Sequence, residues 1–126
     1  MIHLDTSFLI RALVRRSPED LRLRKWLSEG TSVGIGAVAW AEFLCGPVDA
    51  RQLPLAMRII REPVPYLAED AALSARLFNL SGRRRGSLMD CMIAATAVRV
   101  EAALATANPA DFRRLEPAGL KVVSVP

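Results

Sequence analysis

The stretch of residues 87–112 constrains the fold more than any other part of the chain. It reads SLMDCMIAATAVRVEAALATANPADF. Residues 91–98 carry no charge, and a helix that is apolar on every face is a buried helix. Asp90 stands in the first turn of this helix, and a short apolar strand at 103–106 follows it. We therefore expect a central buried helix that leads directly into a buried strand.

Strands and helices alternate along the rest of the chain. We expect strands at 2–4, 31–35, 103–106 and 120–125, a weak strand at 62–66, and helices at 6–16, 18–29, 38–45, 50–60 and 69–80 around the central one. Thr6 or Ser7 is the expected cap of the first helix. Such alternation predicts an α/β fold with a mainly parallel sheet covered on both faces, an α/β/α sandwich. A chain of 126 residues suits one domain, 1–126.

Composition narrows the partners and the compartment. The net charge of +4 favours an acidic partner such as nucleic acid, although a general preference for arginine explains it equally well. Asp5 interrupts any signal peptide, and no apolar run reaches the ~18 residues of a membrane span. Cys45 and Cys91 show no metal or disulfide spacing, so we expect two buried thiols in a cytoplasmic protein with no membrane association.

Acidic residues stand where the expected strands end. Asp5 follows the first strand, and Asp111 follows the strand at 103–106. Glu42 lies in the helix after the second strand, and Asp90 begins the central helix, which runs antiparallel to the strand it precedes. Ligands of parallel sheets bind beyond the carboxyl ends of the strands. We therefore expect these four acids, from four separate segments, to meet at one edge of the sheet.

Each acid also has an ordinary structural interpretation. Asp5 can cap a helix, Ser87 and Asp90 fit a capping box, Glu42 can face solvent, and Asp111 can cap a short turn. Capping alone gives no reason for all four to gather, and gathering has an energetic cost. Two carboxylates ~4 Å apart repel by roughly 4 kcal/mol at an effective dielectric near 20.

A cluster of this kind either raises its pKa values or binds a cation. Ligands that are all oxygen favour Mg²⁺ or Mn²⁺. Such an ion can polarise a phosphodiester and help to generate hydroxide from water. The acidic edge is therefore a candidate for metal-dependent phosphate chemistry.

Four segments of the sequence together resemble a known family. They are DTS at 5–7, AWAEF at 39–43, MDCMIAATA at 89–97 and LATANPADF at 104–112. In order and spacing they resemble the PIN domain, and most of all its small bacterial and archaeal VapC toxins. The resemblance implies an α/β/α sandwich and a ribonuclease dependent on Mg²⁺ or Mn²⁺. The catalytic acids that match by motif are Asp5, Glu42, Asp90 and Asp111, and the supporting polar residues are Thr6, Thr106 and Asn108.

The resemblance also suggests a role for each group. Asp5 and Asp90 would bind the metal directly, while Glu42 and Asp111 would hold it through water. Some relatives carry aspartate where this chain has Asn108, so the resemblance places Asp111 at the metal through water or behind the direct ligands. In the basic joint before the central helix, Arg83, Arg84 and Arg85 would contact RNA phosphates; the alternative is a solvated joint. The lone histidine, His3, is expected to be structural.

The partners implied by the resemblance are an RNA substrate, a cognate VapB-type antitoxin that covers the acidic cleft, and a second copy of the chain. Operator DNA would be bound only through the antitoxin complex. Two alternatives keep the fold: a PIN nuclease that processes RNA without an antitoxin, and a non-catalytic RNA-binding subunit. A phospho-receiver module is disfavoured because Asp5 has no acidic neighbour.

Overall fold

The computed structural model describes residues 1–125, which form one parallel four-stranded sheet. The strands are β1 (Ile2–Leu4), β2 (Val33–Ile35), β3 (Ala103–Ala105) and β4 (Val122–Val123), in the order β2-β1-β3-β4. Leu4 lies opposite Ile35 on one side and Ala105 on the other. The carboxyl ends of β2, β1 and β3 are therefore level, and the residues that follow these strands emerge at one edge of the sheet.

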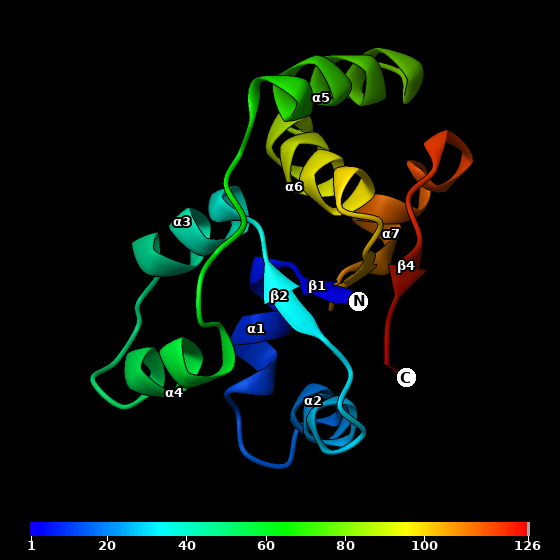
Figure 1. Cartoon of the computed structure of the whole chain (residues 1–126). Coiled ribbons are helices and arrows are strands. Elements are labelled where there is room, and N and C mark those ends of the chain that lie inside the picture. Colours follow the sequence, from blue (N-terminus) through cyan, green and yellow to red (C-terminus); the bar gives the residue numbers. More distant parts are fainter. Residues whose placement is uncertain (126) are drawn as a thin grey trace.

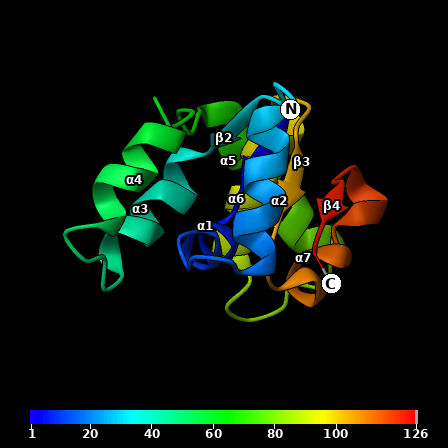
Figure 2. The same ribbon diagram turned by 90° about the horizontal axis from the view of Figure 1, so that it is seen from below.

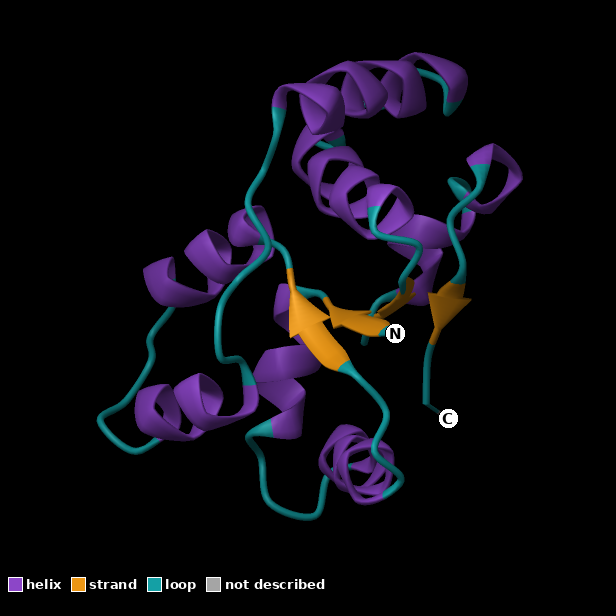
Figure 3. Ribbon diagram, viewed as in Figure 1, coloured by secondary structure: helices purple, strands orange, loops and turns teal. Residues whose placement is uncertain are grey.

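Seven helices surround the sheet within the described chain. They are α1 (Thr6–Ala12), α2 (Pro18–Ser28), α3 (Ala37–Cys45), α4 (Gln52–Ile59), α5 (Ala68–Leu80), α6 (Leu88–Arg99) and α7 (Pro109–Arg113), and a 3-10 turn covers Glu116–Ala118. Figure 1 shows α1 and α2 on one side of the sheet and α5 and α6 on the other, and the turned view in Figure 2 agrees. Figure 3 shows how short the strands are relative to the helices. The predicted α/β/α architecture is confirmed.

The central helix is as buried as its sequence predicts. Six consecutive or near-consecutive residues of α6 are buried: Cys91, Ile93, Ala94, Ala95, Thr96 and Ala97. Most of these side chains are small, so α6 can lie close both to the sheet and to α5, which packs along it. The buried aromatic and aliphatic side chains of β1, α1 and β3 complete the same core.

The first helix differs from the prediction at both ends. Asp5, rather than Thr6 or Ser7, is the N-cap, and its side chain accepts from the backbone N–H of Phe8. The helix ends at Ala12 with Leu13 as its C-cap, and it could not have included Arg16, whose φ is positive at 67°. The backbone N–H of Arg16 then donates to Asp20 at 2.9 Å, which fixes the turn into α2.

Other predictions change in detail. The expected strands at 31–35 and 120–125 shorten to β2 and β4, and the weak strand at 62–66 becomes a single bridge between Gly36 and Val64. Cys91 is buried as expected, but the prediction for Cys45 is wrong: it ends α3 beside solvent and is exposed. Within residues 1–125, the structure has no helix with the length and apolarity that crossing a bilayer requires.

Candidate active site

The topology creates a crevice at the carboxyl edge of the sheet. The chain leaves β1 towards β2 on one side and returns later as β3 on the other, so the strand order reverses at β1. Ligands bind at such switch points in open α/β sheets. The residue after β1 is Asp5 and the residue after β3 is Thr106; the backbone N–H of Asp5 donates to the carbonyl of Ala105 at 3.0 Å. The two polar side chains are thus held side by side.

Asp5 is buried, with 4% of its surface exposed, and three donors hold its carboxylate. Oδ1 accepts from the backbone N–H of Phe8 and from the hydroxyl of Ser7, each at 2.8 Å, and Oδ2 accepts from the hydroxyl of Thr106 at 2.6 Å. Burial still raises the pKa of Asp5; the three hydrogen bonds oppose this and the charge of Glu42 adds to it. Oδ1 already has two partners, so Oδ2 is the oxygen with capacity for a further ligand.

The two hydroxyls that follow Asp5 have different roles. Thr6 donates to the carbonyl of Ala39 at 2.9 Å, so it ties α1 to α3 and does not support the carboxylate as expected. Ser7 takes that part: it donates to Asp5 and accepts from the backbone N–H of Ala107 at 3.1 Å. From the sequence Ser7 was expected only as a possible cap of the first helix, so its bond to the carboxylate was missed. The available signal was its position two residues after Asp5, because an N-cap carboxylate lies over the first turn of its helix.

Asp90 and Asp111 line one cavity. Its volume is about 210 Å³, and it is lined by Arg84, Arg85, Gly86, Ser87, Asp90, Asp111 and Arg114. Both acids are half-buried, one in the first turn of α6 and the other in the first turn of α7. The first turns of two helices, one before and one after β3 in the chain, therefore present carboxylates to the same space.

The electrostatics of Asp90 show that the other acids are near. Burial, followed by the charges of Asp111 and Glu42, raises the pKa of Asp90 to about 6. Arg114 opposes this shift, and Asp5 adds a smaller rise of the same sign. Three acids from three other segments thus disfavour the charge on Asp90. The charges of the other three acids therefore act on Asp90, but only Asp111 shares its cavity.

Two of the expected site residues are open to solvent. Glu42 is exposed on α3, yet its charge acts on both Asp5 and Asp90. Asn108 is exposed at the N-cap of α7; its backbone N–H donates to the hydroxyl of Thr106 at 2.9 Å, and its side chain makes no capping bond within the described chain. Thr106 therefore links Asn108 to Asp5, and the side chain of Asn108 remains available to a ligand.

The ordinary structural interpretations hold for two of the four acids: Glu42 faces solvent, and Asp5 is a helix cap. Asp5 does cap α1, and it lies at the crevice as well. The capping box at Asp90 is absent from the described residues: Ser87 makes no side-chain cap bond and its hydroxyl donates instead to the carbonyl of Arg84 at 2.7 Å. Asp111 is no cap either, since Asn108 is the N-cap of its helix. Helix capping thus leaves the positions of Asp90 and Asp111 unexplained.

The three arginines of the basic joint, Arg83, Arg84 and Arg85, have different surroundings. Arg84 and Arg85 line the cavity of Asp90 and Asp111. Arg83 adopts a positive φ of 54°, bonds to Asn79 and lies over the ring of Phe78, 5.4 Å from its centroid. Arg83 therefore turns towards the end of α5, and the structure separates it from its two neighbours.

The spacing of the acidic side chains limits how a divalent cation could be held. Among residues 1–125, no group of three or more His, Cys, Asp or Glu side chains is close enough to hold an ion jointly. The free carboxylate capacity is nevertheless all oxygen, and Mg²⁺ usually keeps several waters and takes only one or two carboxylates directly. An arrangement with few direct ligands and further acids nearby fits that ion.

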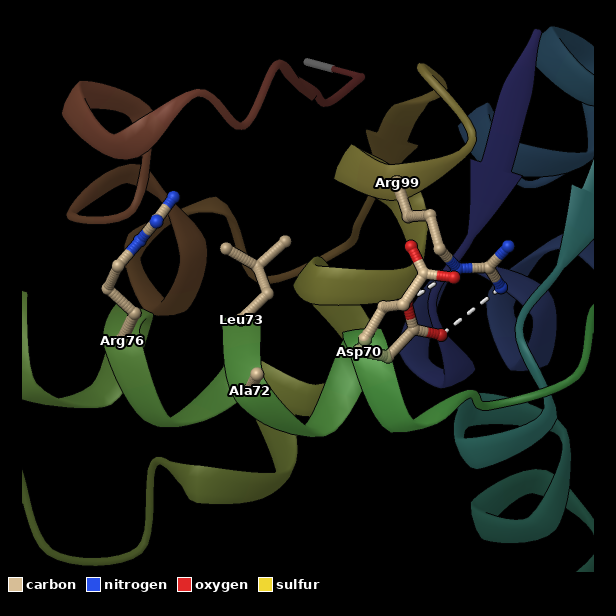
Figure 4. Close-up of a pocket in the computed structure, with 6 residues that line it drawn as sticks. Asp70, Ala72, Leu73, Arg76 and Arg99 are labelled. Atoms are coloured by element: carbon tan, nitrogen blue, oxygen red, sulfur yellow. Dashed lines mark hydrogen bonds and ion pairs between the residues drawn. The ribbon is translucent and has the colours of Figure 1, made fainter.

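A larger cavity, of about 570 Å³, lies elsewhere, between α5 and the end of α6. Figure 4 shows its charged residues, with Asp70 and Arg99 joined across it. Arg99 Nε donates to Asp70 at 2.6 Å. His3 of β1 pairs with Gly34 of β2, and its side chain is buried. Burial, followed by the charge of Arg99, lowers the pKa of His3 to about 4. These groups lie outside the acidic crevice.

Comparison with known proteins identifies the fold family. The model of the PIN domain family matches residues 2–116, which is most of the chain. The chain belongs to the PIN domain family. Its predicted resemblance to that family, drawn from four short motifs, is therefore confirmed.

Solved structures agree with the PIN fold. VapBC2 from Rickettsia felis, bound to a promoter DNA fragment, aligns with a TM-score of 0.78 and 19% identity over 100% of both chains. DNA-bound VapBC from Salmonella typhimurium gives a TM-score of 0.76 and 20% identity over 98% of this chain and 96% of that one. A toxin-antitoxin complex from Klebsiella pneumoniae gives 0.68 and 25%, with the same coverage. No curated protein matches the sequence.

Proposed function

We propose that this PIN domain is a Mg²⁺-dependent endoribonuclease, the toxin of a VapBC-type toxin-antitoxin system, with Mn²⁺ as an alternative ion. One observation carries the proposal: Asp90 and Asp111 line one cavity, and burial of Asp90, together with the charges of Asp111 and Glu42, raises its pKa to about 6. Within the described residues no ion pair involves these acids. A protein that gathers like charges without neutralising them has a use for a cation there.

The residues present fit such an ion. Asp5 and Asp90 are the direct ligands in this proposal, because both are withdrawn from solvent, and Asp5 keeps one carboxylate oxygen with capacity to spare. Glu42 and Asp111 act through water. When bound, the ion supplies positive charge to the scissile phosphate and lowers the pKa of water.

The chain's own residues position the reactants and move the proton. Ser7 and Thr106 fix the orientation of Asp5. Either Glu42 or Asp111 accepts a proton from the attacking water as its oxygen bonds to phosphorus. The bond from phosphorus to one ribose oxygen breaks, and that oxygen takes a proton from solvent. The exposed side chain of Asn108 is placed to donate to the phosphate.

The partners follow from the same proposal. The similar structures are VapBC and other toxin-antitoxin complexes, two of them bound to DNA, which supports a cognate antitoxin for this chain. We propose that operator DNA is contacted through that antitoxin and that the toxin forms a homodimer. The basic residues Arg84 and Arg85 at the acidic cavity support an RNA substrate.

One surface suits the antitoxin. A groove of about 340 Å³ lies between α1, α2 and α4, and the exposed side chains of Leu27 and Leu55 line it. Arg15 also lines it, as does Arg24, which pairs with Asp20. We propose that an apolar helix of the antitoxin docks here with an acidic residue facing Arg15. Leu55→Arg should then weaken neutralisation by the antitoxin while cleavage by the free toxin stays intact. Equal neutralisation of wild type and variant would place the antitoxin elsewhere.

The test of the function is direct. Purified protein should degrade total RNA in Mg²⁺, and EDTA should stop it. Asp90→Asn should be inactive, whereas Glu62→Gln, at an exposed acid outside the cavity, should be active. Co-expression with the protein of the adjacent reading frame should restore growth. Cleavage that persists in EDTA and in Asp90→Asn would remove the proposed chemistry; cleavage without an antitoxin that neutralises it would leave a processing nuclease.

A further inference from the structure

Arg114 is partly buried, and two of the three nitrogens of its guanidinium have no hydrogen-bond partner in the described chain. It is the C-cap of α7, three residues after Asp111. Its Nε and Nη2 atoms are enclosed, and neither has a hydrogen-bond partner among residues 1–125. The ion pairs of the described chain are formed by Arg11, Arg24, Lys25 and Arg99, so none of them includes Arg114.

This arrangement is costly unless something else binds there. A buried donor without an acceptor costs about 1–3 kcal/mol, and more when the group is charged. Native proteins keep few such groups, and each one calls for a ligand, a water or a functional reason. Asp90 and Asp111 line the same cavity, and Arg114 lowers the pKa of Asp90, but neither acid reaches it as an ion pair within the described residues. The guanidinium is therefore poised close to the acids without being neutralised by them.

The cavity itself has the chemistry of an anion site beside a cation site. Three of its lining residues are arginines and two are aspartates. Ser87 already donates to the carbonyl of Arg84, so the charged side-chain donors of the lining are its three arginines. The planar fork of a guanidinium matches two oxygens of a phosphate, and this geometry is specific to arginine.

We propose that Arg114 is a substrate-positioning residue that binds the non-bridging oxygens of an RNA phosphate next to the scissile bond, with Arg84 and Arg85 binding the backbone at the mouth of the cavity. The inference rests on the proposed nuclease function and adds a residue to it. Arg114 gains hydrogen-bond partners only when the RNA backbone enters the cavity. Because Arg114 lies three residues after Asp111, the bound phosphate lies beside the acids that act on the scissile bond.

The competing explanation is that Arg114 only balances the charge of the acidic cluster. A counter-charge of that kind stabilises the fold but has no effect on RNA binding measured without metal. Arg113 offers a matched control: it carries the same charge, is adjacent in sequence, is exposed, and does not line this cavity. Arg114→Met and Arg113→Met therefore have equal net charge and differ in the site alone.

The experiment measures binding of a fluorescein-labelled oligouridylate by anisotropy, in EDTA, over a range of salt concentrations. Arg114→Met should bind about tenfold more weakly, as expected for loss of a charge-assisted contact. The slope of log K against log salt should fall by about 0.7, one released counterion on a single strand. Arg113→Met should change neither quantity. Thermal unfolding of Arg114→Met should occur no lower than in wild type, because methionine keeps the length of the side chain and removes the unpartnered donors.

Arg114→Lys keeps the inference testable if the methionine variant does not fold. Lysine preserves the charge but not the fork, so it should bind more weakly than wild type and keep the wild-type salt slope. Wild-type binding and slope in the folded Arg114 variants, with cleavage still lost in Asp90→Asn, would overturn this inference alone. A wild-type protein that neither binds nor cleaves RNA would overturn it together with the proposed function.

Discussion

Two aspartates occupy the same position on neighbouring helices and have opposite surroundings. Asp70 is the third residue of α5 and Asp90 the third residue of α6, and the two helices pack along each other. Burial acts to raise the pKa of Asp70, but hydrogen bonds from Arg99, from the backbone N–H of Leu67 and from Thr96 outweigh it and lower that pKa. Figure 4 shows the bonds to Arg99. Asp90 has acids for neighbours, and its pKa is raised.

The difference shows that the partners, and not the helix position, decide what such a carboxylate does. Asp70 is fully buried and is satisfied by the protein, which is the condition of a structural charge. Asp90 is half-buried, and the negative charges of Asp111 and Glu42 repel it. A neutral residue at this position would remove that repulsion. Replacing each by its neutral amide should therefore give opposite results.

The largest effect should be the loss of cleavage in Asp90→Asn. Removing a direct ligand of the ion takes away most of the electrostatic stabilisation of the transition state, about 4 kcal/mol, or on the order of 10³ in rate. Asp70→Asn should cleave RNA at nearly the wild-type rate at a temperature where it is folded. Rates on a fluorogenic RNA in Mg²⁺, with Glu62→Gln as the control, would measure both. An active Asp90→Asn enzyme would end the contrast.

The next largest effect should be on the stability of Asp70→Asn. Loss of the negative charge leaves the partly buried Arg99 without its counter-ion. Breaking a buried ion pair in this way lowers the free energy of unfolding by about 3 kcal/mol. The unfolding midpoint should fall by about 10 °C. Glu69→Gln is the matched control, because Glu69 is the exposed neighbour in the same turn and its loss should change little. Equal midpoints for the two variants would mean that Asp70 and Arg99 do not stabilise the fold.

A smaller effect should appear in the pH dependence of the metal-free protein. Because the folded pKa of Asp90 is about 6 and its ordinary value is 3.8, the folded state binds the proton more tightly than the unfolded state. This group's contribution to the unfolding free energy therefore falls as pH rises from about 4 to 6, and stays low above that. Discounted for partial exposure, the penalty is on the order of 1 kcal/mol.

Asp90→Asn should accordingly be more stable than wild type above pH 6 in EDTA, with the gap closing near pH 4. Asp70 acts with the opposite sign: its lowered pKa contributes stability above its unfolded value, and that stability is lost as pH falls through the folded one. Denaturant unfolding at several pH values would measure both. A metal-free Asp90→Asn protein that is less stable than wild type at neutral pH would make Asp90 a structural residue.

The sequence predicted the edge of the sheet well, because strand ends are set by chain direction alone. Asp5 directly after β1 and Thr106 directly after β3 had to be neighbours once the strands paired in parallel. Which of Thr6 and Ser7 would face the carboxylate was not predictable in this way. Successive residues of a helix point about 100° apart, and the phase of α1 depends on Asp5 being its own N-cap.

The contrast between Asp70 and Asp90 was also hidden in the sequence. Ser87 three residues before Asp90 has the pattern of a capping box, whereas Leu67 before Asp70 does not. In the structure it is Asp70 that accepts from the N-cap backbone, at 3.1 Å from the N–H of Leu67. The partner that decides this, Arg99, comes 29 residues later on another helix. Local pattern could not find a bond set by packing, and the same holds for the enclosed Arg114.

The smallest expected effect distinguishes two buried threonines, each of which donates a hydrogen bond to a buried aspartate. Thr96 donates to Asp70 at 3.0 Å and Thr106 donates to Asp5 at 2.6 Å. Thr96→Val should cost about 1 kcal/mol of stability, the net value of one buried hydrogen bond, and leave Mg²⁺ binding unchanged. Thr106→Val should weaken Mg²⁺ binding about tenfold, because the orientation of Asp5 is lost. Calorimetric titration with Mg²⁺ and thermal unfolding in EDTA would resolve the two; if both variants lost stability alone, Asp5 would belong with Asp70 as a structural carboxylate.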